Sequence, residues 1–287
     1  MNRGNDQLSQ TILATLRNPS EPWLPELTEA LVARGWEALR NSHGILPATY
    51  STASVMQRDQ VLTSIDELAK VSTGGQDCFA KIEFLSPEVQ KPFSSDDYKF
   101  ITPFEFSNAS VEDCLSLAFE LIGLVPSLHQ SVVRLVRSIH IIRSNAANCD
   151  ISFSDPALPF SIFVSAPNKN SPNAALRLAE AVVHEAMHLQ LSLLEAVAPI
   201  APNQGQTHYS PWKRSRRHAS GLLHALYVFT TISEWLRRLP ENSNGYSQRR
   251  RAEIAEQVAE IMPFNDAKLT IEGDLLRQYL LAQHADD

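Results

Sequence analysis

The chain has few cysteines, an excess of acidic over basic residues, and no long apolar run. Its three cysteines, Cys78, Cys114 and Cys149, are an odd number without C-x-x-C spacing, which argues against a disulfide framework and a cysteine zinc site. A formal net charge of -7 disfavours a nucleic-acid partner that is bound through its phosphates. Because no apolar run is long enough to span a membrane and the first residues lack the apolar segment of a secretory signal, we expect a cytoplasmic protein with no membrane partner.

Apolar residues recur at helical spacing along most of the 287 residues, of which 44% are hydrophobic. We therefore expect a mainly α fold, in which a helical domain carries a small strand element and a metal site lies between two helices. Residues 1–144 are expected to form a helical N-terminal region, either separate or part of the same domain. Residues 145–287 are expected to form a metal-binding catalytic region.

Several segments carry specific expectations about local structure. The apolar spacing predicts helices over residues 27–39, 61–69, 111–125, 127–143, 222–239, 246–262 and 269–283. The helix over 127–143 would carry His129 and His140, which we expect to be ordinary packed or surface histidines. Residues 74–107 fit either short strands or a covering loop. The β-branched and aromatic run from Phe160 to Val164 predicts a strand, which would flank the next helix and offer backbone groups to an extended peptide.

That next helix carries a His-Glu-x-x-His motif at residues 184–188, and Ser171-Pro172 predicts where the helix begins. Positions i and i+4 of a helix lie on one face about 6 Å apart, so the imidazoles of His184 and His188 can hold one divalent ion. Glu185 then lies beside that ion, where it can take or give a proton. The motif therefore indicates a metal site, against the alternative of a helix with two ordinary histidines.

A third ligand decides which metal chemistry the site performs. Leucines stand where a metzincin would have its glycine and third histidine, which excludes that class. A gluzincin-like zinc peptidase would use a glutamate from a later helix, and Glu234 is the candidate. Glu195 lies about 10 Å of helical rise beyond His188, too far to converge on the same ion. His224 would instead complete a three-histidine site, whose open positions suit either zinc with water or iron with a chelating oxo-acid.

A basic cluster precedes the helix that carries His224. Residues 213–217 contain four basic side chains, which on composition alone are equally well explained as a solvated surface. Arg217 precedes His224 by seven residues, or two helical turns. If the helix extends back that far, Arg217 and His224 would lie on one side of it, separated by about 10 Å.

The order of several motifs resembles the bacterial HExxH-type peptide β-hydroxylases, which depend on 2-oxoglutarate and include HExxH motif-containing peptide-modification proteins. The resemblance covers about residues 138–273 and is weak over the first 130 residues. It is carried by Ser152-Phe153-Ser154-Asp155-Pro156-Ala157-Leu158-Pro159, Val183-His184-Glu185-Ala186-Met187-His188, Tyr209-Ser210-Pro211-Trp212, Gly221-Leu222-Leu223-His224-Ala225, Tyr227-Val228-Phe229, Leu269-Thr270 and Gly273.

The resemblance implies the cofactors and the residues that hold them. In that family, the motif histidines and the histidine of the Gly-Leu-Leu-His stretch hold iron, and these correspond to His184, His188 and His224. An arginine between the Ser-Pro-Trp and Leu-His elements corresponds to Arg217, which would bind the distal carboxylate of 2-oxoglutarate. The chain departs from the family pattern beside this arginine, with lysine in place of the expected arginine after Trp212 and histidine in place of the expected proline after Arg217. Arg214 is therefore the alternative clamp.

The sequence accordingly predicts an iron(II)- and 2-oxoglutarate-dependent oxygenase that hydroxylates a peptide or peptide-like substrate, at the side-chain β-carbon according to the resemblance. In this enzyme Glu185 would position a hydrogen bond or the substrate. The alternative is a gluzincin-like zinc metallopeptidase, in which Glu185 would be the general base. A third possibility is a peptide-binding protein without catalytic activity, which purified protein without metal would favour.

Overall fold

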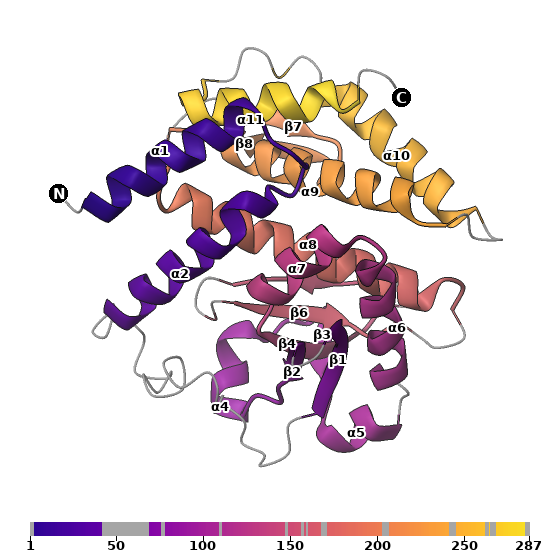
Figure 1. The fold of residues 1–287 in the computed structure, drawn as a ribbon. Coiled ribbons are helices and arrows are strands. Elements are labelled where there is room, and N and C mark those ends of the chain that lie inside the picture. The colour runs from indigo at the N-terminus through magenta and orange to yellow at the C-terminus, as the bar shows by residue number, and fades with distance from the viewer. Residues whose placement is uncertain are drawn as a thin grey trace. The chain divides into compact units, whose positions relative to one another are not determined.

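The structure is a computed structural model that describes residues 3–41, 69–75, 78–108, 111–146, 149–155, 158, 160–167, 171–202, 207–240, 245–261, 264 and 268–284. Its helices are α1 (Arg3–Arg17), α2 (Pro25–Asn41), α4 (Pro87–Gln90), η2 (Lys91–Phe93), α5 (Pro103–Asn108), α6 (Val111–Gly123), α7 (Pro126–Leu135), α8 (Ala174–Glu195), α9 (Ala219–Arg238), α10 (Tyr246–Ile261) and α11 (Ile271–Ala282). Its strands are β1 (Ala69–Gly75), β2 (Cys78–Ile82), β3 (Tyr98–Phe100), β4 (Ser138–Ser144), β5 (Ser152–Phe153), β6 (Ser161–Ser165), β7 (Thr207–Ser210) and β8 (Ser215–His218) (Figure 1).

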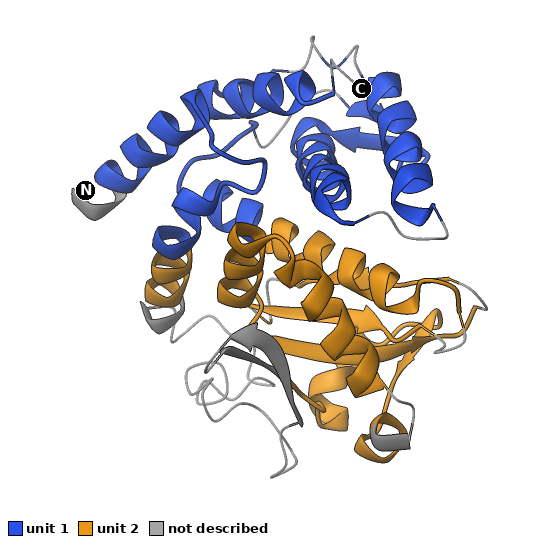
Figure 2. Cartoon of the chain, turned by 45° about the vertical axis from the view of Figure 1, so that its right-hand side comes forward, with its two compact units in different colours: residues 1–31, 190–287 blue, residues 32–189 orange. Residues whose placement is uncertain are grey.

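The expected mainly α fold class is confirmed. Two compact units divide the chain: unit 1 comprises residues 1–31 and 190–287, and unit 2 comprises residues 32–189 (Figure 2). Neither unit ends near residue 144. The domain boundary expected between residues 144 and 145 stays a prediction. Within the described ranges, no helix has the length and apolar character needed to cross a membrane.

Unit 2 is organised around a mixed sheet with the strand order β1-β2-β4-β6-β5, in which β3 also pairs with β4. Strands β2, β4 and β6 run parallel, whereas β1, β3 and β5 are antiparallel to their neighbours. All five residues of β6 and the first five of β4 are buried, as is typical of central parallel strands that are covered on both faces. The apolar cluster against these strands consists of Leu85, Val89, Phe93, Ile142, Leu158 and Phe163.

The predicted helix over residues 127–143 is wrong in its second half. The helix expected over residues 127–143 ends at Leu135, and β4 follows, so His129 lies on α7 but His140 lies on a strand. Ile139 and Ile142 continue the helical spacing of α7, and a strand that is buried on both faces shows no alternation of apolar and polar residues that would distinguish it. His140 is buried, as expected of a packed histidine, and its Nδ1 lies 3.1 Å from the backbone oxygen of Glu83.

The predicted strand over Phe160–Val164 is present as β6, one residue displaced, but its expected role as a peptide-binding strand is wrong. Strand β4 pairs with one side of β6 and β5 with the other, which occupies the backbone groups of Phe163 and Val164. The last strand in the sheet order is β5. At the start of the chain, Ala69 begins β1 rather than ending a helix, and residues 61–68 of that predicted helix lie outside the described residues.

Unit 1 is helical apart from the β7–β8 hairpin. Helix α9 packs against α10, α11 and the hairpin, and α11 also packs against α1. The predicted helices over residues 222–239, 246–262 and 269–283 are confirmed as α9, α10 and α11. A buried hydrogen-bond network supports this unit: Gln190 donates to Thr28 Oγ1 (2.9 Å) and to the backbone oxygen of Leu24 (3.2 Å), and accepts from Tyr227 (2.7 Å).

The start of α11 explains the Thr270 and Gly273 of the sequence motif. Thr270 caps the helix by accepting a hydrogen bond from the backbone N–H of Gly273 at 3.1 Å, and its own hydroxyl donates to the backbone oxygen of Pro199. A Cβ atom on Gly273 would lie 1.9 Å from the backbone oxygen of Ile200, which no side chain can tolerate. These residues therefore have a structural role, because they bring α11 close to the segment that follows α8.

Candidate metal centre

The motif helix α8 begins at Ala174, after Asn173 in a left-handed backbone conformation, so Ser171 and Pro172 precede the helix rather than start it. Most of its apolar residues are buried. Partly or fully exposed positions recur every three or four residues along one stripe: Arg177, Ala181, His184, His188, Ser192 and Glu195. At 100° per residue, the two motif histidines and Glu195 fall within an arc of about 40°. This accessible stripe of α8 therefore carries both motif histidines and Glu195.

The two motif histidines lie side by side. Their ring centroids are 4.8 Å apart, and the ring planes make an angle of 65°. The side chain of His184 is 26% exposed, and His188 is half-buried as well. Two adjacent imidazoles that solvent can reach are a donor pair suited to a divalent transition metal, so the residues present fit the predicted ion in chemistry.

Glu185 is buried beside this pair. Its Oε1 accepts a hydrogen bond from the hydroxyl of Ser152 at 2.7 Å and lies 3.9 Å from Nε2 of His184. Ser152 belongs to β5, and Asp150, two residues earlier, accepts a hydrogen bond from Arg177 of α8 at 2.7 Å. The contact between Ser152 and Glu185 was missed from the sequence. The presence of Ser152 in the resembling segment was the only available signal, and it did not indicate which residue the hydroxyl contacts.

His224 lies on α9, where its Nε2 is 2.8 Å from Oε2 of Glu195. The other carboxylate oxygen of Glu195 accepts a hydrogen bond from Ser220 at 2.7 Å. Burial raises the pKa of Glu195, but the hydrogen bonds from His224 and Ser220 and the charge interaction with His224 outweigh it, so the pKa lies below its ordinary value. Sequence reasoning excluded Glu195 as a ligand from its distance along α8 and overlooked that it contacts His224.

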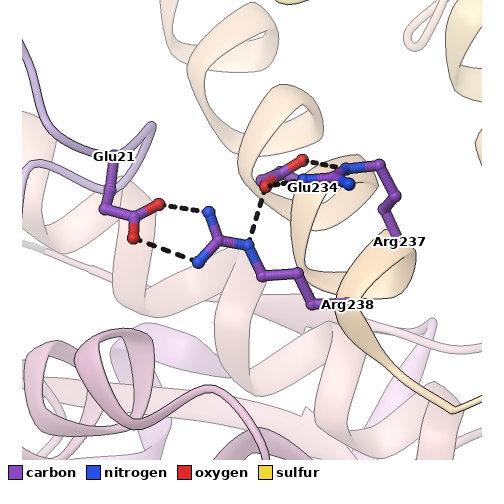
Figure 3. A network of polar contacts seen from close by, with 4 residues as sticks. All are labelled: Glu21, Glu234, Arg237 and Arg238. Atoms are coloured by element: carbon purple, nitrogen blue, oxygen red, sulfur yellow. Dashed lines mark hydrogen bonds and ion pairs between the residues drawn. The ribbon is translucent and has the colours of Figure 1, made fainter.

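Glu234, the ligand candidate of the peptidase alternative, is held by two arginines of its own helix. Arg237 donates to both of its oxygens at 2.6 and 2.7 Å, and Arg238 donates to Oε1 at 2.7 Å. Arg238 also makes a two-pronged contact with Glu21 (Figure 3). A metal at Glu234 would have to displace or repel these guanidinium groups, so the network weighs against Glu234 as a ligand.

The basic cluster forms the turn and second strand of a hairpin. Arg217 is on β8, so the helix does not extend back to it as expected, because residues 215–218 pair with β7 instead. Arg217 nevertheless lies against the first turn of α9, since a Cβ atom on Gly221 would be 3.8 Å from its own Cβ. Gly221 and His224 are neighbours on the helix surface at i and i+3. The helix on which the expectation depended is absent at Arg217, and a shared side for Arg217 and His224 stays a prediction.

The arginines of the hairpin differ in their contacts. Arg216 donates to the hydroxyl of Thr207 at 2.9 Å and also to the backbone oxygen of that residue. The side chains of Arg214 and Arg217 make no hydrogen bond or ion pair with any residue that the structure describes, and both residues are exposed. Arg214 lies at the end of the turn with φ 48°, a conformation that is strained for a residue with a Cβ atom. Arg217 lies on the regular strand β8, and the choice between Arg217 and Arg214 as the carboxylate clamp stays a prediction.

The structure brings together the predicted site residues only in part. His184, Glu185 and His188 belong to unit 2, whereas Arg214, Arg217 and His224 belong to unit 1. Among the described residues, no group of three or more His, Cys, Asp and Glu side chains is arranged to hold a metal ion. The three-histidine site therefore stays a prediction.

No family model matches this chain, and no curated protein is significantly similar to it.

Proposed function

We propose that this chain is an iron(II)- and 2-oxoglutarate-dependent oxygenase that hydroxylates a peptide or peptide-like substrate. The observation that carries the proposal is the accessible pair of imidazoles on α8, His184 and His188, with the buried carboxylate of Glu185 beside them. The motif order that resembles the peptide β-hydroxylases supports His224 as the third iron ligand. Bound iron(II) and 2-oxoglutarate would supply the oxidative chemistry that hydroxylates a C–H bond.

The contacts of the carboxylates of Glu234 and Glu185 support an oxygenase over a gluzincin-like peptidase. Glu234, which the peptidase would need as a ligand, is engaged by Arg237 and Arg238. Glu185 is buried and accepts a hydrogen bond from Ser152, which suits a carboxylate that holds its neighbours in place. Arg217 supplies a guanidinium without an ion pair among the described residues, and guanidinium binds a carboxylate through two parallel hydrogen bonds.

The placement of β5 supports a peptide-like substrate. Strand β5 is the last strand in the sheet order, and its Ser152 contacts the motif residue Glu185. An extended peptide can add to the outer edge of such a strand through backbone hydrogen bonds. A substrate bound there would lie beside the motif helix.

The test is to identify the bound metal and to measure succinate formed from 2-oxoglutarate in the presence of iron(II), with wild type and Glu185→Gln. The amide keeps the shape of the side chain and a hydrogen-bond acceptor for Ser152, so we expect wild type to form succinate and the variant to retain part of this activity. A zinc peptidase would instead lose roughly 100-fold to 10,000-fold of its rate without its general base. Absence of succinate, with peptide fragments that disappear in the variant, would replace the oxygenase with the peptidase.

A further inference from the structure

The contact between His224 and Glu195 has the form of a ligand histidine with its supporting carboxylate. Nε2 of His224 lies 2.8 Å from Oε2 of Glu195, and Ser220 donates to Oε1 of the same carboxylate at 2.7 Å. Ser220 and His224 are four residues apart on α9 and thus share one face of it. The side chain of His224 is only 13% exposed and that of Glu195 is 27% exposed, so this cluster is largely shielded from water.

The chemistry of the carboxylate determines which nitrogen of the ring carries the proton. An ionised carboxylate only accepts hydrogen bonds, so the nitrogen that faces Glu195 must be Nε2–H. In the neutral ring, the lone pair that a metal needs is then on Nδ1. Histidines that bind metals almost always donate their other N–H to a carboxylate, a carbonyl or water, which fixes the tautomer and the ring orientation.

We propose that Glu195 is a positioning residue for His224: it accepts a hydrogen bond from Nε2–H, fixes the tautomer, and makes Nδ1 the nitrogen that binds the metal. This inference rests on the proposed function, in which His224 is an iron ligand. Glu195 acts through His224 and not as a ligand itself, because both its oxygens already accept hydrogen bonds. Ser220 holds the second oxygen and so limits rotation of the carboxylate.

Metal affinity provides the first test. The variants are Glu195→Ala, Glu195→Gln and His224→Ala, with Glu180→Ala as a control that removes a partly buried glutamate from the same helix. Zn(II) and Fe(II) are titrated into metal-free protein against a competing chelator. We expect Glu195→Ala to weaken binding about 10-fold to 100-fold, the usual effect of losing such a carboxylate. Glu195→Gln should recover part of the affinity, because its amide oxygen can still accept from Nε2–H, and Glu180→Ala should bind like wild type.

The ring nitrogens provide a readout that a merely structural role would not change. Nitrogen-15 NMR of the Zn(II)-loaded protein, with the His224 signals assigned from the His224→Ala spectrum, shows which nitrogen binds the metal. We expect Nδ1 on the metal and a proton on Nε2 in wild type and in Glu195→Gln. In Glu195→Ala we expect a mixture of ring states.

The outcomes separate this inference from the function on which it rests. If His224→Ala binds metal as tightly as wild type, the three-histidine site and the proposed function fail together with the inference. If His224 is required but Glu195→Ala binds metal like wild type, only the inference is overturned. It is also overturned if Nε2 of His224 is found on the metal, or if Glu195→Gln loses metal as completely as His224→Ala, since Glu195 would then be a ligand.

Discussion

A glutamate carboxylate is bound near each end of α9, and the groups that bind the two carboxylates have opposite chemical character. Near the start of the helix, Glu195 is paired with a histidine and a serine, His224 and Ser220. Near the end, Glu234 is surrounded by guanidinium groups. A histidine can exchange its proton for a metal, whereas a guanidinium stays protonated and repels one. The partner of each carboxylate, more than the carboxylate itself, therefore decides which end of α9 can belong to a metal site.

The largest expected effect tests this comparison through metal retention. We predict that His224→Ala loses the bound metal, as do His184→Ala and His188→Ala, because three protein ligands are the usual minimum in a catalytic metal site. Glu234→Ala should retain the metal. The measurement is the metal content of each purified variant. If His224→Ala keeps its full metal content and Glu234→Ala loses the metal, the ligand lies at the other end of α9. That result would favour the gluzincin-like peptidase.

The second prediction concerns the hairpin that precedes α9. Arg217→Ala should raise the KM for 2-oxoglutarate about 10-fold to 100-fold, which corresponds to the roughly 1.5–3 kcal/mol of a charge-assisted hydrogen bond. Metal content should not change. The matched control is Arg216→Ala, since Arg216 is the neighbouring arginine but is engaged by Thr207. If Arg216→Ala raises KM as much as Arg217→Ala does, the hairpin acts through its fold or overall charge, and Arg214 becomes the next candidate.

The sequence predicted the elements of unit 1 better than the contacts among them. Helices α10 and α11 follow from apolar spacing, because each has one buried face and one exposed face, whereas α9 is buried on all sides from Leu226 to Ser233. Strand β4 was missed because its residues from Ser138 to Ile142 are all buried, which removes the alternation that distinguishes a strand from a helix. The general mainly α class was nevertheless correct.

In the candidate site too, contacts within one helix could be predicted from the sequence, whereas contacts between distant segments could not. The spacing of His184 and His188 fixes their adjacency, because both lie on one helix. The contact of Glu195 with His224 depends on how α9 packs against the end of α8, which no spacing reveals. Glu234 is occupied in part by its ion pair with Arg238. Arg238 also pairs with Glu21, which is 217 residues away in the chain. Long-range contacts of this kind decide which candidate residues are available for chemistry.

The third prediction tests whether the far end of α9 is structural. Arg238 joins Glu21 to Glu234 and lies over the ring of Trp23 at 4.9 Å from its centroid. Arg238→Ala should lower the free energy of unfolding by about 1–2 kcal/mol, since it leaves two partly shielded carboxylates close together. Arg237 also pairs with Glu234 but is 54% exposed, so Arg237→Ala should cost less than about 1 kcal/mol. Urea unfolding of the metal-free variants measures both values, and equal losses would contradict the bridging role of Arg238.

The smallest expected effect is a dependence on pH that belongs to the arginine-bound end of α9. Burial raises the pKa of Glu234, but hydrogen bonds from Arg237 and Arg238 and their charges outweigh it, so its pKa in the folded protein lies below the ordinary value of 4.5. A depressed carboxyl pKa stabilises the fold above the unfolded value, and this contribution is lost as the pH falls through the folded value. We therefore expect the Tm difference between wild type and Glu234→Gln to be constant at pH values well above 4.5 and to shrink progressively as the pH falls below 4.5. The comparison is made by thermal unfolding of metal-free protein across that range. If the Tm difference between the two proteins does not change with pH, the guanidinium groups do not stabilise the charged form of Glu234. The electrostatic contrast between the two ends of α9 would then be wrong.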